Sequence, residues 1–529
     1  MAIVLFALIF ATAKAAPMKC DGISDDSQAF AASAAAAQAN QTALMIPPGT
    51  CLLNSGLTIT LAADLSISGS GTLKVNAGVW PYPKTAWLDI DANGHAFSLA
   101  GVTLDQSWKT SLRGRPAGFS DGTAPSTWGD DWTIRVSRAA GASITRVTFI
   151  NIMRGIYFLD SGNIVAKNNT FRALAVNATS LWAFENCSNV LLDSNSHMGI
   201  SWLDSATDYS INGEYSWNSS HLTFRNNVWH GLQIVNRCGT VGACTDILYD
   251  SNTIDTPVAD TSTGNFQRMV SRGNRVSNSG DMGITCDNCN FVEITGNTID
   301  GVANGGIAVS TGKVAATGSA VTSIDIRDNT VVNPVQDYPA VQKLSGRRSA
   351  SAGEWASCIS IYTQPPADTV STNATISGNR CTMTAAPPVS DSAGLVRETA
   401  RGIVCGVTTN PTPQTCVIRR NVVKDETGLV PGFIIYAADR RIAGNYRLTG
   451  APRTGEVFTC PETGNSFVMI AIHPPHWLWA KGLRNDSIGG ADRFFGADSK
   501  AAITFSQAPT VDHNGVTFES NEEGRPTDP

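Results

Sequence analysis

The sequence predicts an all-β chain folded as a parallel β-helix, and the main observation is a repeated phrase of asparagine, any residue and an apolar residue. Clear copies begin at Asn169, Asn226, Asn252, Asn274, Asn297, Asn329 and Asn421, and weaker ones at Asn195, Asn379 and Asn445. The middle copies lie 22 to 26 residues apart. A period of this length marks a solenoid, in which one repeat cannot bury its apolar face alone. We expect the asparagines to stack at one bend and to bond backbone groups that the turn leaves unpaired.

The segments around these asparagines predict strands. An alternating segment precedes many copies, as in 291–296, and Gly-Ile or Gly-Leu pairs follow several of them at 199, 231, 283 and 306. Each repeat therefore holds two or three short strands with no helix between them. The 48 glycines suit such a turn-rich β protein.

The N-terminus has the pattern of a signal peptide. Residues 2–12 form an apolar run that is too short to span a bilayer, and the small-residue site 13–15 follows it. We expect residues 1–15 to be removed, so that no part of the chain is inserted in a membrane. A buried N-terminal helix is the alternative interpretation.

Twelve cysteines fit a secreted or periplasmic protein. The pairs that are close enough to bond are Cys20/Cys51, Cys238/Cys244, Cys286/Cys289, Cys358/Cys381 and Cys405/Cys416. The pair at 286 and 289 resembles a redox or zinc half-site, but nothing supplies a second half. Disulfides or buried thiols are favoured, and we expect no metal site.

The first ordered element after the signal is a helix. The segment 21–30, Asp-Gly-Ile-Ser-Asp-Asp-Ser-Gln-Ala-Phe, runs into an alanine-rich stretch at 31–39, with Ser24 or Asp25 as the natural N-cap. Residues 43–53 then read as strand, turn and strand. We expect residues of about 20–55 to cover the open apolar end of the solenoid.

This opening resembles that of the pectate-lyase-like superfamily, in its Asp-Gly-x-Ser-Asp-Asp-x-x-Ala-Phe helix and the Pro-Pro-Gly-Thr strand at 47–50. The superfamily includes polygalacturonase-type hydrolases, phage tailspike depolymerases, polysaccharide lyases and C5-epimerases. The resemblance implies a right-handed parallel β-helix that acts on polysaccharide. It does not choose among these chemistries.

The expected organisation is one elongated domain with additions. The β-helix catalytic domain spans 16–450, with insertions at about 105–133, 333–357 and 383–400. Residues 451–529 form a C-terminal cap or appended module. A net charge of −6 argues against a nucleic-acid partner. The expected partner is a polysaccharide, and the oligomeric state stays open.

Aligning the coils on their Gly-Ile pairs gives candidate catalytic residues, because neighbouring coils lie about 4.8 Å apart. Four residues after the anchor come Asp160, Glu185, Asp204, Asn236 and Asn288. Glycosidic hydrolysis needs two carboxyl groups, about 5 Å apart for retention and about 6.5–9.5 Å for inversion. We therefore select Asp204 with Asp208, and Asp281 or Glu185 as a third acid. His230 is placed to tune a carboxyl pKa or to hold a sugar hydroxyl. These acids would otherwise be turn caps.

Aromatic and polar residues in the same coils are candidates for substrate binding. The set comprises Trp182, Tyr209, Trp217, Arg154, Gln233 and Arg237. Aromatic rings stack on sugar faces, and for Trp182 and Trp217 a place in the groove is favoured over a place in the core.

The leading functional hypothesis is a secreted glycoside hydrolase that needs no cofactor. A polysaccharide lyase is the alternative; its base would be His230, Tyr209 or Arg237. Its uronate carboxylate would be neutralised by Ca²⁺ or by one of the basic residues Arg154, Lys167, Arg225 and Arg237. A non-catalytic surface adhesin is a third possibility. The polygalacturonase motifs and the Asp-Pro-His motif of alginate epimerases are absent, which counts against galacturonan hydrolysis and against epimerisation.

Overall fold

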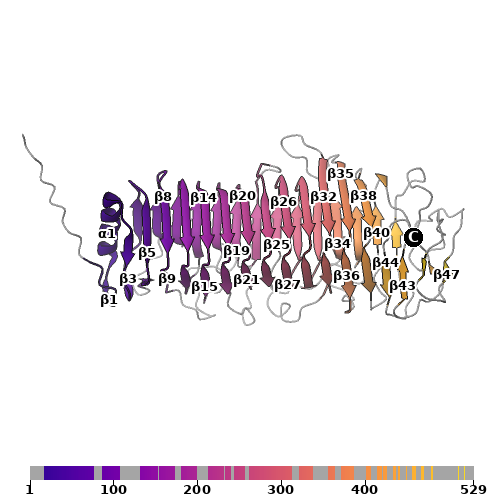
Figure 1. Ribbon diagram of the computed structural model, residues 1–529, viewed down its shortest axis with the longest axis horizontal. Coiled ribbons are helices and arrows are strands. Elements are labelled where there is room, and N and C mark those ends of the chain that lie inside the picture. The colour runs from indigo at the N-terminus through magenta and orange to yellow at the C-terminus, as the bar shows by residue number, and fades with distance from the viewer. Residues whose placement is uncertain are drawn as a thin grey trace, which may run out of the picture.

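A computed structural model shows a rod made of three long parallel sheets (Figure 1). The structure describes residues 17–76, 86–107, 132–152, 154–172, 180–198, 212–231, 233–239, 243–255, 261–311, 321–336, 356–363, 371–385, 401–406, 414–419, 421–425 and 433–436, and short strands between 439 and 518. The predicted fold class is confirmed: apart from one helix, the elements are strands. The expected signal peptide and most of the insertion at 105–133 lie outside the described residues.

We call the three sheets A, B and C. Sheet C has 14 strands. They are β4 (Leu57–Thr60), β7 (Ala86–Asp91), β10 (Trp132–Ser137), β13 (Arg154–Leu159), β16 (Ser180–Glu185), β19 (Asn212–Trp217), β22 (Gln233–Arg237), β25 (Thr261–Gly264), β28 (Ile284–Asp287), β31 (Ile307–Thr311), β34 (Ser357–Thr363), β37 (Arg401–Gly406), β40 (Phe433–Tyr436) and β45 (Leu478–Ala480).

Sheet B also has 14 strands. They are β2 (Leu44–Ile46), β5 (Leu65–Gly69), β8 (Ala96–Ala100), β11 (Gly141–Thr145), β14 (Gly162–Lys167), β17 (Ser188–Asp193), β20 (Ser220–Arg225), β23 (Ile247–Asp250), β26 (Arg268–Arg272), β29 (Phe291–Thr295), β32 (Val321–Arg327), β35 (Ser371–Ser377), β38 (Gln414–Arg419) and β41 (Asp439–Arg440).

Sheet A has 17 strands. They are β1 (Asp21–Asp25), β3 (Thr50–Leu53), β6 (Thr72–Val75), β9 (Thr103–Asp105), β12 (Thr148–Ile150), β15 (Thr170–Arg172), β18 (Ser196–Met198), β21 (Val228–His230), β24 (Thr253–Asp255), β27 (Arg275–Ser279), β30 (Thr298–Val302), β33 (Thr330–Val332), β36 (Arg380–Met383), β39 (Val422–Asp425), β43 (Glu456–Thr459), β44 (Ser466–Met469) and β46 (Thr510–Val511). A separate antiparallel pair consists of β42 (Leu448–Thr449) and β47 (Thr517–Phe518).

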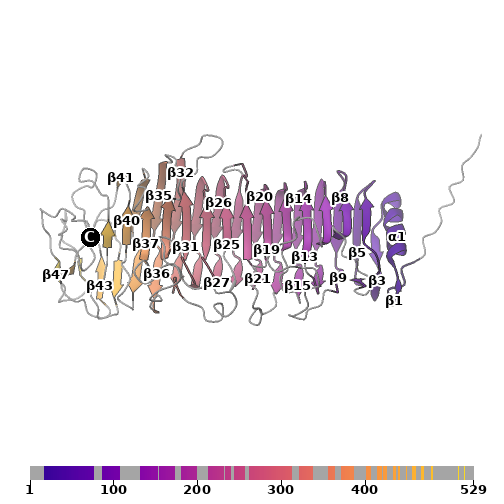
Figure 2. The same cartoon turned by 180° about the vertical axis from the view of Figure 1, so that it is seen from behind.

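Each coil of the rod passes from sheet C to sheet B, then to sheet A, and returns to sheet C one strand further on (Figure 2). Strand crossovers between parallel strands are right-handed as a rule, which matches the right-handed helix that the resemblance implies. β44 and β45 pair with β39 and β40, so sheets A and C extend beyond residue 450, where the sequence repeat is no longer recognisable.

The repeated asparagines form a buried ladder at the bend between sheets B and A. Asn297 shows the pattern: its Nδ2 donates to Ser271 O (2.9 Å) and to Asn329 Oδ1 (3.0 Å), and its Oδ1 accepts the backbone N–H of Asn274 (2.9 Å). The ladder comprises Asn169, Asn195, Asn227, Asn252, Asn274, Asn297, Asn329, Asn379 and Asn421. The prediction of Asn226 was one residue off, because its neighbour Asn227 fills the site.

The apolar residue of the phrase points into the rod. It forms one continuous row on the inner side of sheet A: Leu104, Phe149, Phe171, His197, Trp229, Ile254, Val276, Ile299, Val331, Cys381 and Val423. Stacked rings fill the early coils, with Phe149 and Phe171 at 4.3 Å between centroids. These residues belong to one core that runs along the coils.

The helix α1 (Ser27–Asn40) lies at the N-terminal end of the rod (Figure 1). Phe30, Ala34 and Ala37 of α1 are buried in the common core. Asp25 accepts the backbone N–H of Ser27 at the start of the helix (2.9 Å). Among the described residues, none of the helices has the length and apolar character that crossing a bilayer requires.

Four of the five predicted disulfides are confirmed, namely Cys20–Cys51, Cys238–Cys244, Cys286–Cys289 and Cys358–Cys381. The side chains of the fifth pair, Cys405 and Cys416, lie outside the described part of the chain. Cys187 is the free cysteine among the described residues; it is buried, and burial raises the pKa of its thiol to about 12.

Candidate functional site

A row of polar and aromatic side chains runs along the outer face of sheet C. Glu185 on β16, Trp217 on β19 and Arg237 on β22 are direct register partners on consecutive strands. Gly264 on β25 and Asp287 on β28 continue the row. We call these five residues the Glu185 row. Paired strands are about 4.8 Å apart, so the structure brings together three residues that the sequence selected independently.

Glu185 is held in position by a tyrosine from the preceding coil. The phenol of Tyr157 on β13 donates to Glu185 Oε2 at 2.5 Å. Burial, reinforced by the bond to Glu185, raises the pKa of Tyr157 well above that of a free tyrosine, so the phenol stays protonated and donates. Glu185 itself is only partly buried, which leaves its carboxylate accessible from the outer face. The sequence did not identify Tyr157 as a site residue.

Arg237 lies along the row and bonds residues of the next two strands. Its Nη1 contacts Asp287 Oδ2 at 2.8 Å, and its Nη2 donates to Ser262 Oγ. Asp287 also accepts the hydroxyl of Ser310 (2.8 Å). The guanidinium passes over Gly264, where an added Cβ would lie 2.4 Å from Nη1. The missing side chain at Gly264 is therefore what allows Arg237 to reach Asp287.

Trp217 offers an aromatic surface between Glu185 and Arg237. Its side chain is 37% exposed, which is unusual for the largest apolar residue. Tyr215, two residues earlier, is also on the outer face, and burial raises its pKa to about 12. An exposed indole beside a carboxylate and a guanidinium fits the stacking and hydrogen bonding that a sugar ring accepts. Trp217 therefore lies at the surface and not in the core, and its role in substrate binding stays a prediction.

The placement of Trp182 in a groove is wrong. Trp182 is fully buried, and its Nε1 donates to Nε2 of His197 at 2.8 Å. Its register partner is the inward-facing Ile156, whereas the outward-facing Tyr157 pairs with Ala183. Side chains alternate between the faces of a strand, so an alignment error of one residue moved Trp182 from the core to the surface.

The same alignment error affects the expected column of acids and amides. Glu185 pairs with Leu159 and Trp217, whereas Asn236 points inward in a different row. Asp160 and Asn288 are turn residues with positive φ angles. The four of these positions that the structure describes, Asp160, Glu185, Asn236 and Asn288, therefore do not form one column.

The expectation that Arg154 binds substrate is also wrong. Arg154 is 2% exposed, and its guanidinium lies 5.5 Å from the ring centroid of Trp132. Trp132 in turn stacks on Tyr157 at 5.3 Å. Arg154 supports the outer face of sheet C from within a packed layer and does not present a free cation.

His230 does not join Glu185. It lies on β21 of sheet A, where its Nδ1 contacts Asp255 Oδ2 at 2.9 Å. From there the chain enters sheet C at Gln233, whereas Glu185 ends its strand. A strand of five residues spans about 16 Å. His230 lies just before the edge where the chain enters sheet C, and Glu185 lies at the edge where the chain leaves it. The side chain of Gln233 lies outside the described residues.

Asp281 is separated from Glu185 along the rod. It lies in the turn before β28, where its Oδ1 accepts the amide of Asn304 at 2.5 Å and its backbone O accepts the Asn304 N–H. β28 is four strands from β16, or about 19 Å. Glu185 and Asp281 therefore cannot share one glycosidic bond. Asp204, Asp208 and Tyr209 lie outside the described residues.

Sequence reasoning also missed a buried acid in the core. Glu214 on β19 points inward and is fully buried; Asn236 Nδ2 donates to its Oε2 at 2.7 Å, while its Oε1 has no partner. Burial raises the pKa of Glu214 well above its usual value. Asn236 also donates to the hydroxyl of Tyr249 (2.7 Å). A polar residue in an alternating strand normally faces solvent, so nothing in the sequence pattern marked this acid as buried.

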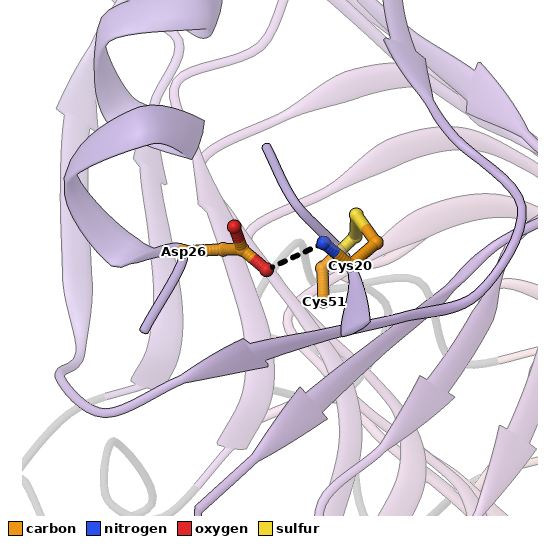
Figure 3. A group of neighbouring side chains, drawn as sticks. All are labelled: Cys20, Asp26 and Cys51. Carbon is orange, nitrogen blue, oxygen red and sulfur yellow. Dashed lines mark hydrogen bonds between the residues drawn. A yellow bond between two sulfur atoms is a disulfide. The ribbon is translucent and has the colours of Figure 1, made fainter. Parts of the chain in front are cut away.

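Within the described residues, one cluster has the composition of a metal site: Cys20, Asp26 and Cys51 (Figure 3). The two cysteines form a disulfide, which removes both thiolate ligands. Asp26 accepts the backbone N–H groups of Lys19 (2.7 Å) and Cys20 (3.0 Å). This cluster ties the N-terminal segment to the first coil and is structural.

Known proteins resemble this chain in structure and not in sequence. No family model and no curated protein sequence matches the chain. An exopolygalacturonase from Thermotoga maritima is 12% identical, with a TM-score of 0.36 over 85% of this chain and 89% of that one. The A-module of mannuronan C-5 epimerase AlgE6 from Azotobacter vinelandii is 15% identical, with a TM-score of 0.39 over 79% and 94%. The surface adhesin PfbA of Streptococcus pneumoniae is 12% identical, with a TM-score of 0.38 over 94% and 97%. The three long parallel sheets of this chain make it a parallel β-helix.

Proposed function

We propose that the chain is a polysaccharide hydrolase whose active site lies on the outer face of sheet C around Glu185. The observation that carries the proposal is the register of Glu185, Trp217 and Arg237 on three consecutive strands, with Tyr157 bonded to Glu185. Glycosidic cleavage requires a pair of carboxyl groups, of which Glu185 would be one, and the exposed indole of Trp217 can stack on a sugar ring.

In this proposal Glu185 acts as the nucleophile or as the base that activates water. Tyr157 orients it by donating a hydrogen bond to Oε2, which leaves the other oxygen for the sugar. A second carboxyl group must protonate the leaving oxygen. The best candidates are Asp204 and Asp208, in the segment that leads into β19 beside β16. Hydrolysis by two carboxyl groups requires no cofactor.

The state of the cations favours hydrolysis over β-elimination. A lyase needs a cation to neutralise the uronate carboxylate, and four basic residues were candidates. Arg237 is bonded to Asp287, and Arg154 is packed on Trp132. Lys167 and Arg225 both contact Asp193, on sheet B. None of these four is a free charge on the outer face of sheet C.

Export is part of the proposal. Four disulfides are in place among the described residues, and disulfides persist in oxidising compartments. Together with the signal-like N-terminus, they support a secreted or periplasmic enzyme.

A polysaccharide panel tests the proposal. The full-length protein is incubated with each polymer, and reducing ends and ultraviolet absorbance are recorded together. Hydrolysis raises reducing ends without the absorbance of an unsaturated uronate, whereas a lyase raises both. Polymer that binds without either signal would mark a non-catalytic adhesin and would refute the hydrolase.

Variants locate the activity. Glu185→Gln should lower kcat by about 10² to 10⁴-fold, the usual contribution of a positioned acid or base. Trp217→Ala should raise KM more than it lowers kcat, because stacking serves the bound substrate. Glu293→Gln, on the outer face of sheet B, is the matched control and should keep wild-type kinetics.

A further inference from the structure

On sheet C, the arginines whose side chains the structure describes are all engaged within the chain, which bears on the charge of the substrate. Arg135 on β10 binds Asp89 through two bonds, of 2.8 and 2.6 Å, and Asp89 is only 6% exposed. Arg138, in the turn that follows β10, binds Asp91. Both acids come from β7, one coil earlier. The two pairs neutralise the N-terminal part of this face.

The cations nearer to Glu185 are engaged as well. Arg237 is shared between Asp287 and Ser262, and Arg154 is buried over Trp132. Across the part of sheet C whose side chains the structure describes, with its turns into sheet B, no lysine occurs and every arginine is held by one of these contacts. A uronate, sulfate or phosphate group would therefore find no cation here that is not already bound.

The sequences of three segments that connect sheet A to sheet C contain acidic residues and no basic ones. Residues 173–179, 199–211 and 256–260 join sheet A to sheet C beside β16, β19 and β25. Their sequences contain Asp204, Asp208 and Asp260 and no lysine or arginine. With Glu185 on the face itself, a polyanion would be repelled, and the repulsion would be strongest at low ionic strength.

The groups that remain available bind hydroxyl groups and sugar faces. Trp217 supplies an exposed ring, and the carboxylate of the partly buried Glu185 accepts hydrogen bonds. We propose that the substrate is an uncharged polysaccharide, built of sugars that bear hydroxyl or acetamido groups and no acidic group where the chain lies over β16–β25. This inference rests on the proposed function and names its substrate class.

The test uses pairs of polymers that differ in charge and share a backbone. The first pair is dextran and dextran sulfate; the second is fully methyl-esterified polygalacturonan and polygalacturonate. Binding to the full-length wild-type protein is measured at low and at high salt, and cleavage is measured as reducing ends over a wider panel of neutral and acidic polymers. We expect cleavage among the neutral polymers. Each charged partner should bind at least 10-fold more weakly than its neutral partner at low salt, with a smaller difference at high salt.

One pair of variants tests the mechanism of exclusion. Asp287→Asn releases Arg237 and should increase binding of dextran sulfate several-fold. Asp250→Asn releases Arg272 in the same way on sheet B, away from the site, and should leave that binding unchanged.

The outcomes separate the two proposals. Cleavage of an acidic polymer as efficient as that of any neutral one overturns the inference and leaves the hydrolase intact. Failure to cleave any polymer of either class refutes the hydrolase, and the inference with it.

Discussion

Trp182 donates its indole N–H to Nε2 of His197 at 2.8 Å, across the interior of one coil. The register places Glu214 next to Trp182 and Trp229 next to His197 in the following coil. In that coil Glu214 Oε1 and Trp229 Nε1 are both buried without a partner. Two consecutive coils beneath the Glu185 row thus carry an acceptor and a donor at the same two inward positions, where the coils on either side carry apolar residues.

The buried acid makes stability depend on pH. The raised pKa of Glu214 means that the folded chain keeps a proton that the unfolded chain releases above its ordinary pKa of 4.5. Stability therefore falls as pH rises above that value, by up to about 1.4 kcal/mol per pH unit for one proton. Glu214→Gln should remove this fall in the pH range above 4.5, as measured by urea unfolding at several pH values. Glu293→Gln should retain it. An identical slope in wild type and Glu214→Gln would contradict this assignment.

His197 acts with the opposite sign. Burial lowers the pKa of His197 to about 3 from 6.5, so the folded chain resists protonation. Its contribution is present above pH 6.5 and is lost as pH falls toward 3. His197→Phe should flatten this acid limb, yet cost about 1–3 kcal/mol at pH 7, because the indole N–H of Trp182 loses its acceptor. Adding Trp182→Phe should recover part of that cost. A double variant that is as unstable as the sum of the single ones would show that the bond contributes nothing.

A methyl group added at Gly264 should break the ion pair between Arg237 and Asp287 in the Glu185 row. Gly264→Ala places a methyl group 2.4 Å from Arg237 Nη1, and the flexible end of the side chain must move. We expect binding and cleavage of polysaccharide to change as they do in Arg237→Met, with a loss of unfolding free energy below about 1.5 kcal/mol. Gly141→Ala, which meets nothing closer than 3.8 Å, is the control. Wild-type kinetics in Gly264→Ala would show that the Arg237–Asp287 pair is not part of the site.

The asparagine ladder should be costly to interrupt. Asn297→Ala removes two donated bonds and three accepted bonds in a fully buried position. Each buried group left without a partner costs about 1–3 kcal/mol, so we expect a loss of at least about 3 kcal/mol. The neighbouring exposed residue offers a control, Thr298→Ala, which should cost less than about 1 kcal/mol. A loss below 1 kcal/mol for Asn297→Ala would mean that water replaces the ladder.

Much of the fold was predictable because each asparagine of the ladder recurs in the sequence as part of the Asn-x-apolar phrase. A buried asparagine must be followed two positions later by an inward residue, so the phrase locates the turn and the row that contains Phe171 and Ile254. The candidate site was harder to predict. Its outward row depends on register within sheet C, where no asparagine fixes the alignment and an error of one residue exchanges the faces. Trp182 was misplaced for this reason, and Tyr157 and Asp287 were missed.

The most direct test of the account is kcat for Glu185→Gln on a polymer that the wild type cleaves, with thermal unfolding of both proteins measured alongside. The account predicts a loss of about 10² to 10⁴-fold at an unchanged Tm. A kcat within twofold of wild type, in a variant that unfolds like wild type, would contradict it and would move the active site away from the outer face of sheet C.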